Sequence, residues 1–113
     1  MADNGKKKNL KWTEADIKTL PFNQLRVLAY FIKTNKPFLD SADIKKELGL
    51  KEKQLGGIMG TFQKTAKGKS PLVFHVFRVG RNFRWAINKE ELPVVKKAIT
   101  EIKPYLDNGD MDA

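Results

Sequence analysis

Apolar residues recur with two different periods along this chain, and the period separates the expected helices from the expected strands. A shorter helix is expected from Thr13, whose side chain can form a capping box with Asp16. A recurrence every three or four residues predicts further helices with one buried face. These helices cover residues 22–33, 42–48 and 51–66 and the stretch that follows Asn88.

Two stretches rich in β-branched and aromatic residues predict a β-hairpin over residues 72–87. Gly80-Arg81-Asn82 is the expected tight turn between the strands. Two registers remain open at this stage. A three-residue loop places Arg78 opposite Arg84, where like charges are unfavourable without an anion between them, and a two-residue loop pairs Arg84 with Phe77.

The segment from Ser41 to Phe62 has the pattern of a helix-turn-helix, with Leu48-Gly49-Leu50 at the turn. Followed by the hairpin, it resembles the winged-helix superfamily of DNA-binding domains over roughly residues 20–106. The resemblance implies an α+β fold in which a helix-turn-helix is followed by a two-stranded β-hairpin wing and a C-terminal helix. We expect one such domain over residues 12–106, between a flexible basic arm (1–11) and an acidic disordered tail (107–113).

The basic charge of the chain is concentrated in one part of the sequence. The net charge is +9, and residues 51–89 contain nine lysines and arginines against Glu52 alone. Such a block is expected of a surface that binds a polyanion. A generic soluble basic surface would have its lysines spread more evenly.

The helix expected over residues 51–66 offers an outer face for DNA. At 100° per residue, this face lies opposite the apolar stripe that contains Leu55 and Phe62. Its lysines can neutralise phosphates, and the Gln and Thr side chains on its flanks can bond base edges or phosphate oxygens. Arginines of the hairpin suit a narrow minor groove or the phosphate backbone. The expected DNA-binding residues are Lys51, Lys53, Gln54, Gly57, Gly60, Thr61, Lys64, Lys67, Arg78, Arg81 and Arg84.

Three glycines within this helix need a reason, because each destabilises a helix interior by about 0.5–1 kcal/mol relative to alanine. Two reasons are open. A neighbouring helix can pack closely on Gly56, or the bare backbone at Gly57 and Gly60 can let DNA approach.

Other chemistry finds little support in the sequence. There are no cysteines, and the single histidine, His75, is expected to be a satisfied structural residue of a strand. No nucleophile–base arrangement or phosphate loop is visible, so we expect no enzyme and no cofactor. Trp12, Trp85 and the phenylalanines fall at core periods, which makes stacking on single strands the minor interpretation.

The expected partner is therefore double-stranded DNA, bound by an intracellular (cytoplasmic) transcriptional regulator or general DNA-associated protein. No membrane partner is expected, since no apolar run is long enough to span a bilayer. The last helix can complete the core or form a homodimer interface. Two alternatives remain: a winged-helix module for protein–protein contact in a larger assembly, and an RNA-binding domain.

Overall fold

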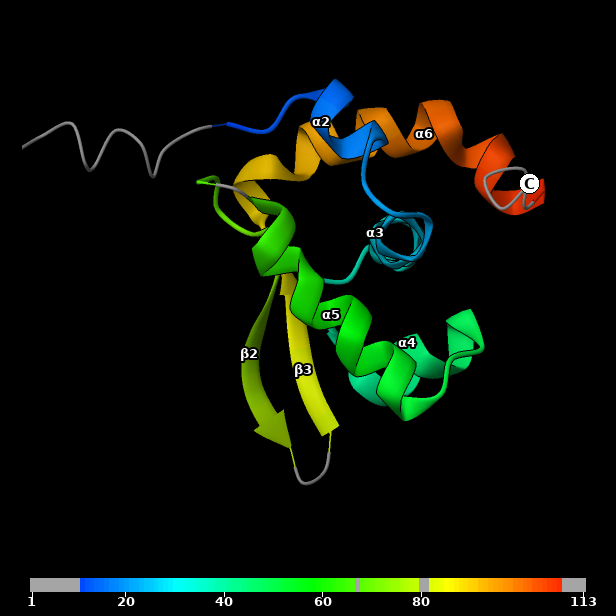
Figure 1. The fold of residues 1–113 in the computed structure, drawn as a ribbon, viewed down its shortest axis with the longest axis vertical. Coiled ribbons are helices and arrows are strands. Elements are labelled where there is room, and N and C mark those ends of the chain that lie inside the picture. The colour runs from blue at the N-terminus through cyan, green and yellow to red at the C-terminus, as the bar shows by residue number, and fades with distance from the viewer. Residues whose placement is uncertain (1–10, 67, 80–81, 109–113) are drawn as a thin grey trace, which may run out of the picture.

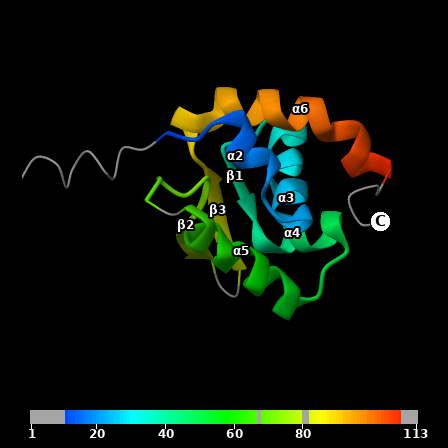
Figure 2. The same cartoon turned by 45° about the horizontal axis from the view of Figure 1, so that its top comes forward.

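The computed structural model of the protein describes residues 11–66, 68–79 and 82–108, and these form an α+β fold. Helix α3 is central: α2 and α6 lie together on one side of it, and α5 lies on the other (Figure 1; Figure 2). The elements are α2 (Glu14–Lys18), α3 (Phe22–Thr34), β1 (Phe38–Asp40), α4 (Ser41–Leu48), α5 (Glu52–Ala66), β2 (Val73–Val79), β3 (Asn82–Ile87), a 3₁₀ turn (Lys89–Glu91) and α6 (Leu92–Asn108).

Local hydrogen bonds fix the ends of these helices. The expected capping box is present, because the Asp16 N–H donates to Thr13 Oγ1 over 3.2 Å and the Thr13 N–H donates to Asp16 Oδ2 over 3.1 Å. Helix α4 ends at Gly49, whose φ of 67° lies in the left-handed region that glycine tolerates. The Leu50 N–H then donates to the Lys45 carbonyl over 2.9 Å, which closes the turn before α5.

The sheet is antiparallel, with strand order β1-β3-β2. The expected wing of two strands therefore gains a third, because Leu39 of β1 pairs with Trp85 of β3. Val79 pairs with Asn82, so Asn82 belongs to β3 and not to the turn. The two-residue-loop register is confirmed: Arg84 pairs with Phe77, and the alternative that opposed Arg78 to Arg84 is wrong.

One continuous apolar core joins the helices to the sheet. The face of α5 that was expected to be buried contributes Leu55, Met59 and Phe62, each at most 5% exposed. Helix α6 buries Val95, Ala98 and Ile99 against the same core, while Tyr105 further along the helix stays exposed. Within the described residues, no helix is both long and apolar enough to cross a membrane.

Candidate nucleic-acid interface

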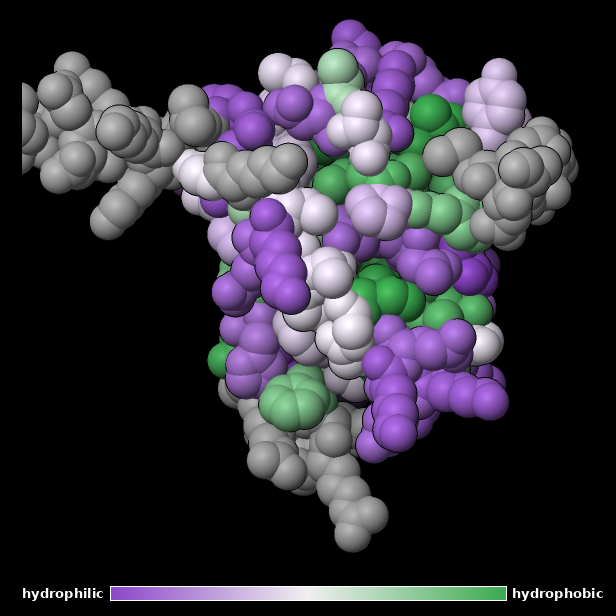
Figure 3. Space-filling model, in the orientation of Figure 1, coloured by the Kyte–Doolittle hydropathy of each residue, from purple (hydrophilic) through white to green (hydrophobic). Residues whose placement is uncertain are grey.

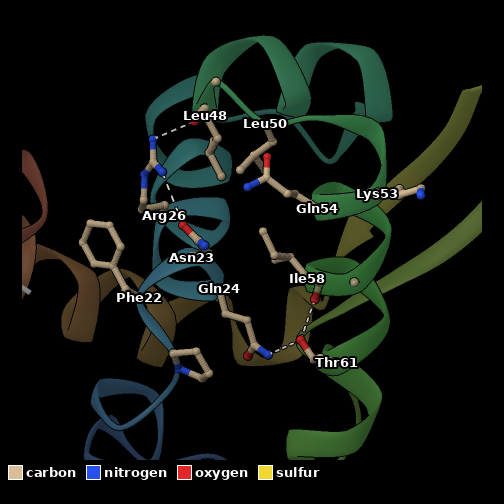
Figure 4. Close-up of a pocket in the computed structure, with 13 residues that line it drawn as sticks. Phe22, Asn23, Gln24, Arg26, Leu48, Leu50, Lys53, Gln54, Ile58 and Thr61 are labelled. Carbon is tan, nitrogen blue, oxygen red and sulfur yellow. Dashed lines mark hydrogen bonds between the residues drawn. The ribbon is translucent and has the colours of Figure 1, made fainter. Parts of the chain in front are cut away.

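Helix α5 is held in place by its turn and by α3. The Lys51 N–H, just before α5, donates to Gln54 Oε1 over 2.8 Å, so the Gln54 side chain caps the helix that it belongs to. Arg26 of α3 donates to the Leu48 carbonyl over 3.0 Å and to Asn23 Oδ1 over 3.3 Å (Figure 4). The bond to Leu48 ties α3 to the turn that sets the direction of α5, and the bond to Asn23, within α3, orients the Arg26 side chain.

A polar contact lies on the flank of α5 that faces α3. Gln24 of α3 is 1% exposed, and its Nε2 donates to Thr61 Oγ1 over 2.5 Å (Figure 4). The Thr61 hydroxyl donates in turn to the Ile58 carbonyl over 2.6 Å. Thr61 is therefore half-buried and its hydroxyl is engaged within the protein. The sequence placed Thr61 on a flank of the outer face, and in the structure this flank faces α3.

The outer face of α5 is lysine-bearing at its ends and has no side chains in its middle. Lys53, Gly57, Gly60 and Lys64 are all exposed on this face, and exposed Lys51 directly precedes the helix. We call these five residues the α5 ridge. In Figure 3, the surface over the middle of α5 is nearly neutral, and hydrophilic surface lies over both ends of the helix.

The lysines of the α5 ridge have no acidic partner, in contrast to several other lysines of the fold. Lys18 pairs with Glu101, and Lys33 Nζ lies 3.3 Å from Glu47 Oε2. In the described part of the chain, no ion pair involves a lysine of the α5 ridge. Their charge is thus available to an external anion.

The glycines of α5 do not serve helix packing. All three are exposed, and a Cβ built at Gly56, Gly57 or Gly60 meets no heavy atom within 4 Å. The alternative that a neighbouring helix packs closely on Gly56 is therefore wrong. The backbone of α5 is instead open to solvent over more than one helical turn.

The hairpin adds less to this surface than the sequence suggested. Arg84 Nε donates to Asp40 Oδ1 over 2.8 Å, and this hydrogen bond raises the pKa of the Arg84 guanidinium. Because Arg84 alternates with Phe83 and Trp85, which line a groove beside α5, it faces the opposite side of the sheet. Lys67, Arg81 and the side chain of Arg78 lie outside the described residues.

Exposed aromatic rings on the sheet are a feature that the sequence analysis missed. His75 and Phe83 lie with Trp85 on the side that faces α5, and both are exposed. Phe38 and Phe74 are exposed on the other side of the sheet. The available signal was the run of residues 72–77, which is apolar or aromatic at both odd and even positions and thus on both faces of one strand.

Neither a protein-family model nor a curated protein nor a solved structure matches the chain at a significant level. The functional argument therefore rests on the chemistry of these residues alone.

Proposed function

We propose that the protein is a winged-helix DNA-binding domain that places α5 in the major groove and the β2–β3 hairpin against the neighbouring backbone or minor groove. The element order supports this architecture, because a helix-turn-helix leads directly into an antiparallel hairpin, and β1 completes a small sheet. In this role the protein needs no catalytic group or cofactor.

The α5 ridge is the observation on which the proposal depends. Lys53 and Lys64 are eleven residues apart, or about 16 Å along a helix that rises 1.5 Å per residue. If α5 enters the major groove at an angle, lysines at its two ends can reach the phosphates on either side of a groove roughly 12 Å wide. Between them, the bare backbone at Gly57 and Gly60 lets the helix approach the groove without side-chain interference.

The test is fluorescence anisotropy of a labelled duplex of about 25 base pairs, titrated with protein from roughly 50 to 300 mM salt. We expect an association constant whose logarithm falls steeply with the logarithm of salt concentration, because binding to phosphates releases counterions. The double variant Lys53→Gln/Lys64→Gln should bind more weakly. Its slope should be shallower by about 1.8, since each of the two phosphates that these lysines neutralise contributes about 0.9.

Lys36→Gln/Lys96→Gln is the matched control. It removes the same charge from two exposed lysines that, like those of the α5 ridge, form no ion pair within the described residues, and that line a groove to which α5 contributes no residue. Equal reductions in affinity in the two double variants would mean that binding follows net charge and not the α5 ridge. Absence of binding at the lowest salt would refute the DNA proposal and favour an acidic protein partner, and preference for duplex RNA would favour an RNA-binding domain.

A further inference from the structure

A groove of about 330 Å³ lies between α5 and the sheet, on the flank of α5 opposite the Thr61 contact. Two α5 glycines and three rings of the sheet face it, and its lining is completed by Ser41, Ala42, Leu55, Met59 and the ion pair between Lys45 and Glu52. We call this site the aromatic groove. Its principal residues are Gly56, Met59, Gly60, His75, Phe83 and Trp85.

The rings of the aromatic groove are arranged edge to face. The His75 and Phe83 centroids lie 4.9 Å apart with their planes at 73°, and the His75 and Trp85 centroids lie 5.6 Å apart at 65°. Trp85 is oriented by a hydrogen bond from its Nε1 to Ser41 Oγ over 2.9 Å. The ring nitrogens of His75 have no hydrogen-bond partner among the described residues, so they can form hydrogen bonds with a ligand.

On the helix side, Gly56 and Gly60 leave the aromatic groove open beside the side chains of Glu52, Leu55 and Met59, because a Cβ at either glycine would meet nothing within 4 Å. The volume lies at the lower end of the range of roughly 300–1,000 Å³ that small-molecule sites occupy. A single planar ring system fits such a space, and a helix does not. Aromatic walls favour a ligand that can stack or meet them edge to face.

We infer that the aromatic groove binds one unpaired nucleobase of the DNA strand that lies along α5. This rests on the proposed function, since that strand must supply the base. Gly60 belongs to both the α5 ridge and the aromatic groove, so the two sites are continuous and a base can enter beside its own phosphate. The lysines of the α5 ridge, which have no ion pair, favour a polyanion over an apolar protein segment. In a DNA strand, the group that can stack on aromatic rings is a base that is not paired with the other strand.

The experiment compares two labelled duplexes that differ by one central unpaired adenosine, bound by the full chain at the same salt concentration. We expect the bulged duplex to bind more tightly by a factor on the order of ten, the size of one base–aromatic stacking contact. Phe83→Ala, which removes one ring, should abolish this preference. Gly56→Leu, which fills the groove from an open helix position outside the α5 ridge, should also abolish it and keep the affinity for the perfect duplex.

Phe74→Ala is the matched control, because Phe74 and Phe83 are both 39% exposed and lie on opposite faces of the sheet. It should retain the preference. Equal affinities for the two duplexes would overturn the inference while leaving the proposed function intact. So would a preference that survives in Phe83→Ala and Gly56→Leu, or one that Phe74→Ala also removes. Absence of binding to both duplexes would instead refute the proposed function.

Discussion

Gly57→Ala should make the protein more stable and its DNA binding weaker. Gly57 lies within α5 at a helical φ, is exposed, and offers open space to a Cβ. Alanine at this position should therefore contribute its full advantage in helix propensity over glycine, so the free energy of unfolding should rise by about 0.5–1 kcal/mol. For a domain near this size, that corresponds to an increase in Tm of roughly 3–6 °C. A methyl group inserted into a close helix–DNA contact costs about 1–3 kcal/mol, so the Kd should rise by about tenfold.

Urea unfolding and anisotropy on the same preparations measure the two effects. The predicted rise in stability excludes unfolding as the cause of weaker DNA binding, because a variant that is more stable cannot lose affinity by unfolding. Gly49→Ala is the control for the stability effect: its φ of 67° opposes a Cβ, so it should destabilise the protein by about 1–2 kcal/mol. If Gly57→Ala destabilises the fold, the description of α5 as an open helix is wrong. If it stabilises the fold and leaves the Kd unchanged, DNA does not approach the α5 backbone.

Two further predictions concern groups outside the α5 ridge. Thr61→Val should lower the free energy of unfolding by about 1–3 kcal/mol, because the buried Gln24 amide loses its closest partner. The DNA affinity of the folded variant at fixed salt should not change, and weaker binding would return Thr61 to the interface. The pKa of Glu101 lies below its ordinary 4.5 because Lys18 donates a hydrogen bond to the carboxylate, and the pKa of Asp16 is lowered by the hydrogen bond from the Thr13 N–H. The two carboxylates stabilise the fold at pH values above their ordinary pKa, and this stabilisation is lost as the pH falls through their lowered pKa values. The free energy of unfolding measured in urea should therefore decline below about pH 5, and it should decline less in Glu101→Gln.

The sequence predicted the elements of the core well, because each has a strong local cause. The capping box at Thr13 and the left-handed Gly49 depend on residues that lie within a few positions of one another, and the stripe of α5 depends only on helical period. The same period also identified the exposed α5 ridge. Local patterns are sufficient where the interaction itself is local.

The site details that the sequence did not predict depend on interactions between distant segments. The position of Thr61 on α5 does not indicate that Gln24, 37 residues away, donates a hydrogen bond to its hydroxyl. Arg84 meets Asp40 because β1 pairs with β3, a contact between segments 44 residues apart that the hairpin sequence does not indicate. The exposure of Phe74 and Phe83 depends on which sheet faces the helices leave uncovered.

Two independent costs to stability coincide on α5, and their coincidence is the strongest reason to place a partner there. Each exposed glycine destabilises the helix by about 0.5–1 kcal/mol, and none is needed for a turn or a close approach within the described residues. The lysines of the α5 ridge add charge to a basic chain without an ion pair to offset it. Lys36 and Lys96 also have no ion pair within the described residues, but among the described helices only α5 combines such lysines with exposed glycines. Folding explains neither feature, and a polyanion that approaches the bare backbone explains both. If Gly57→Ala and the Lys53/Lys64 double variant both keep wild-type affinity for DNA, this common explanation fails and the two features need separate causes.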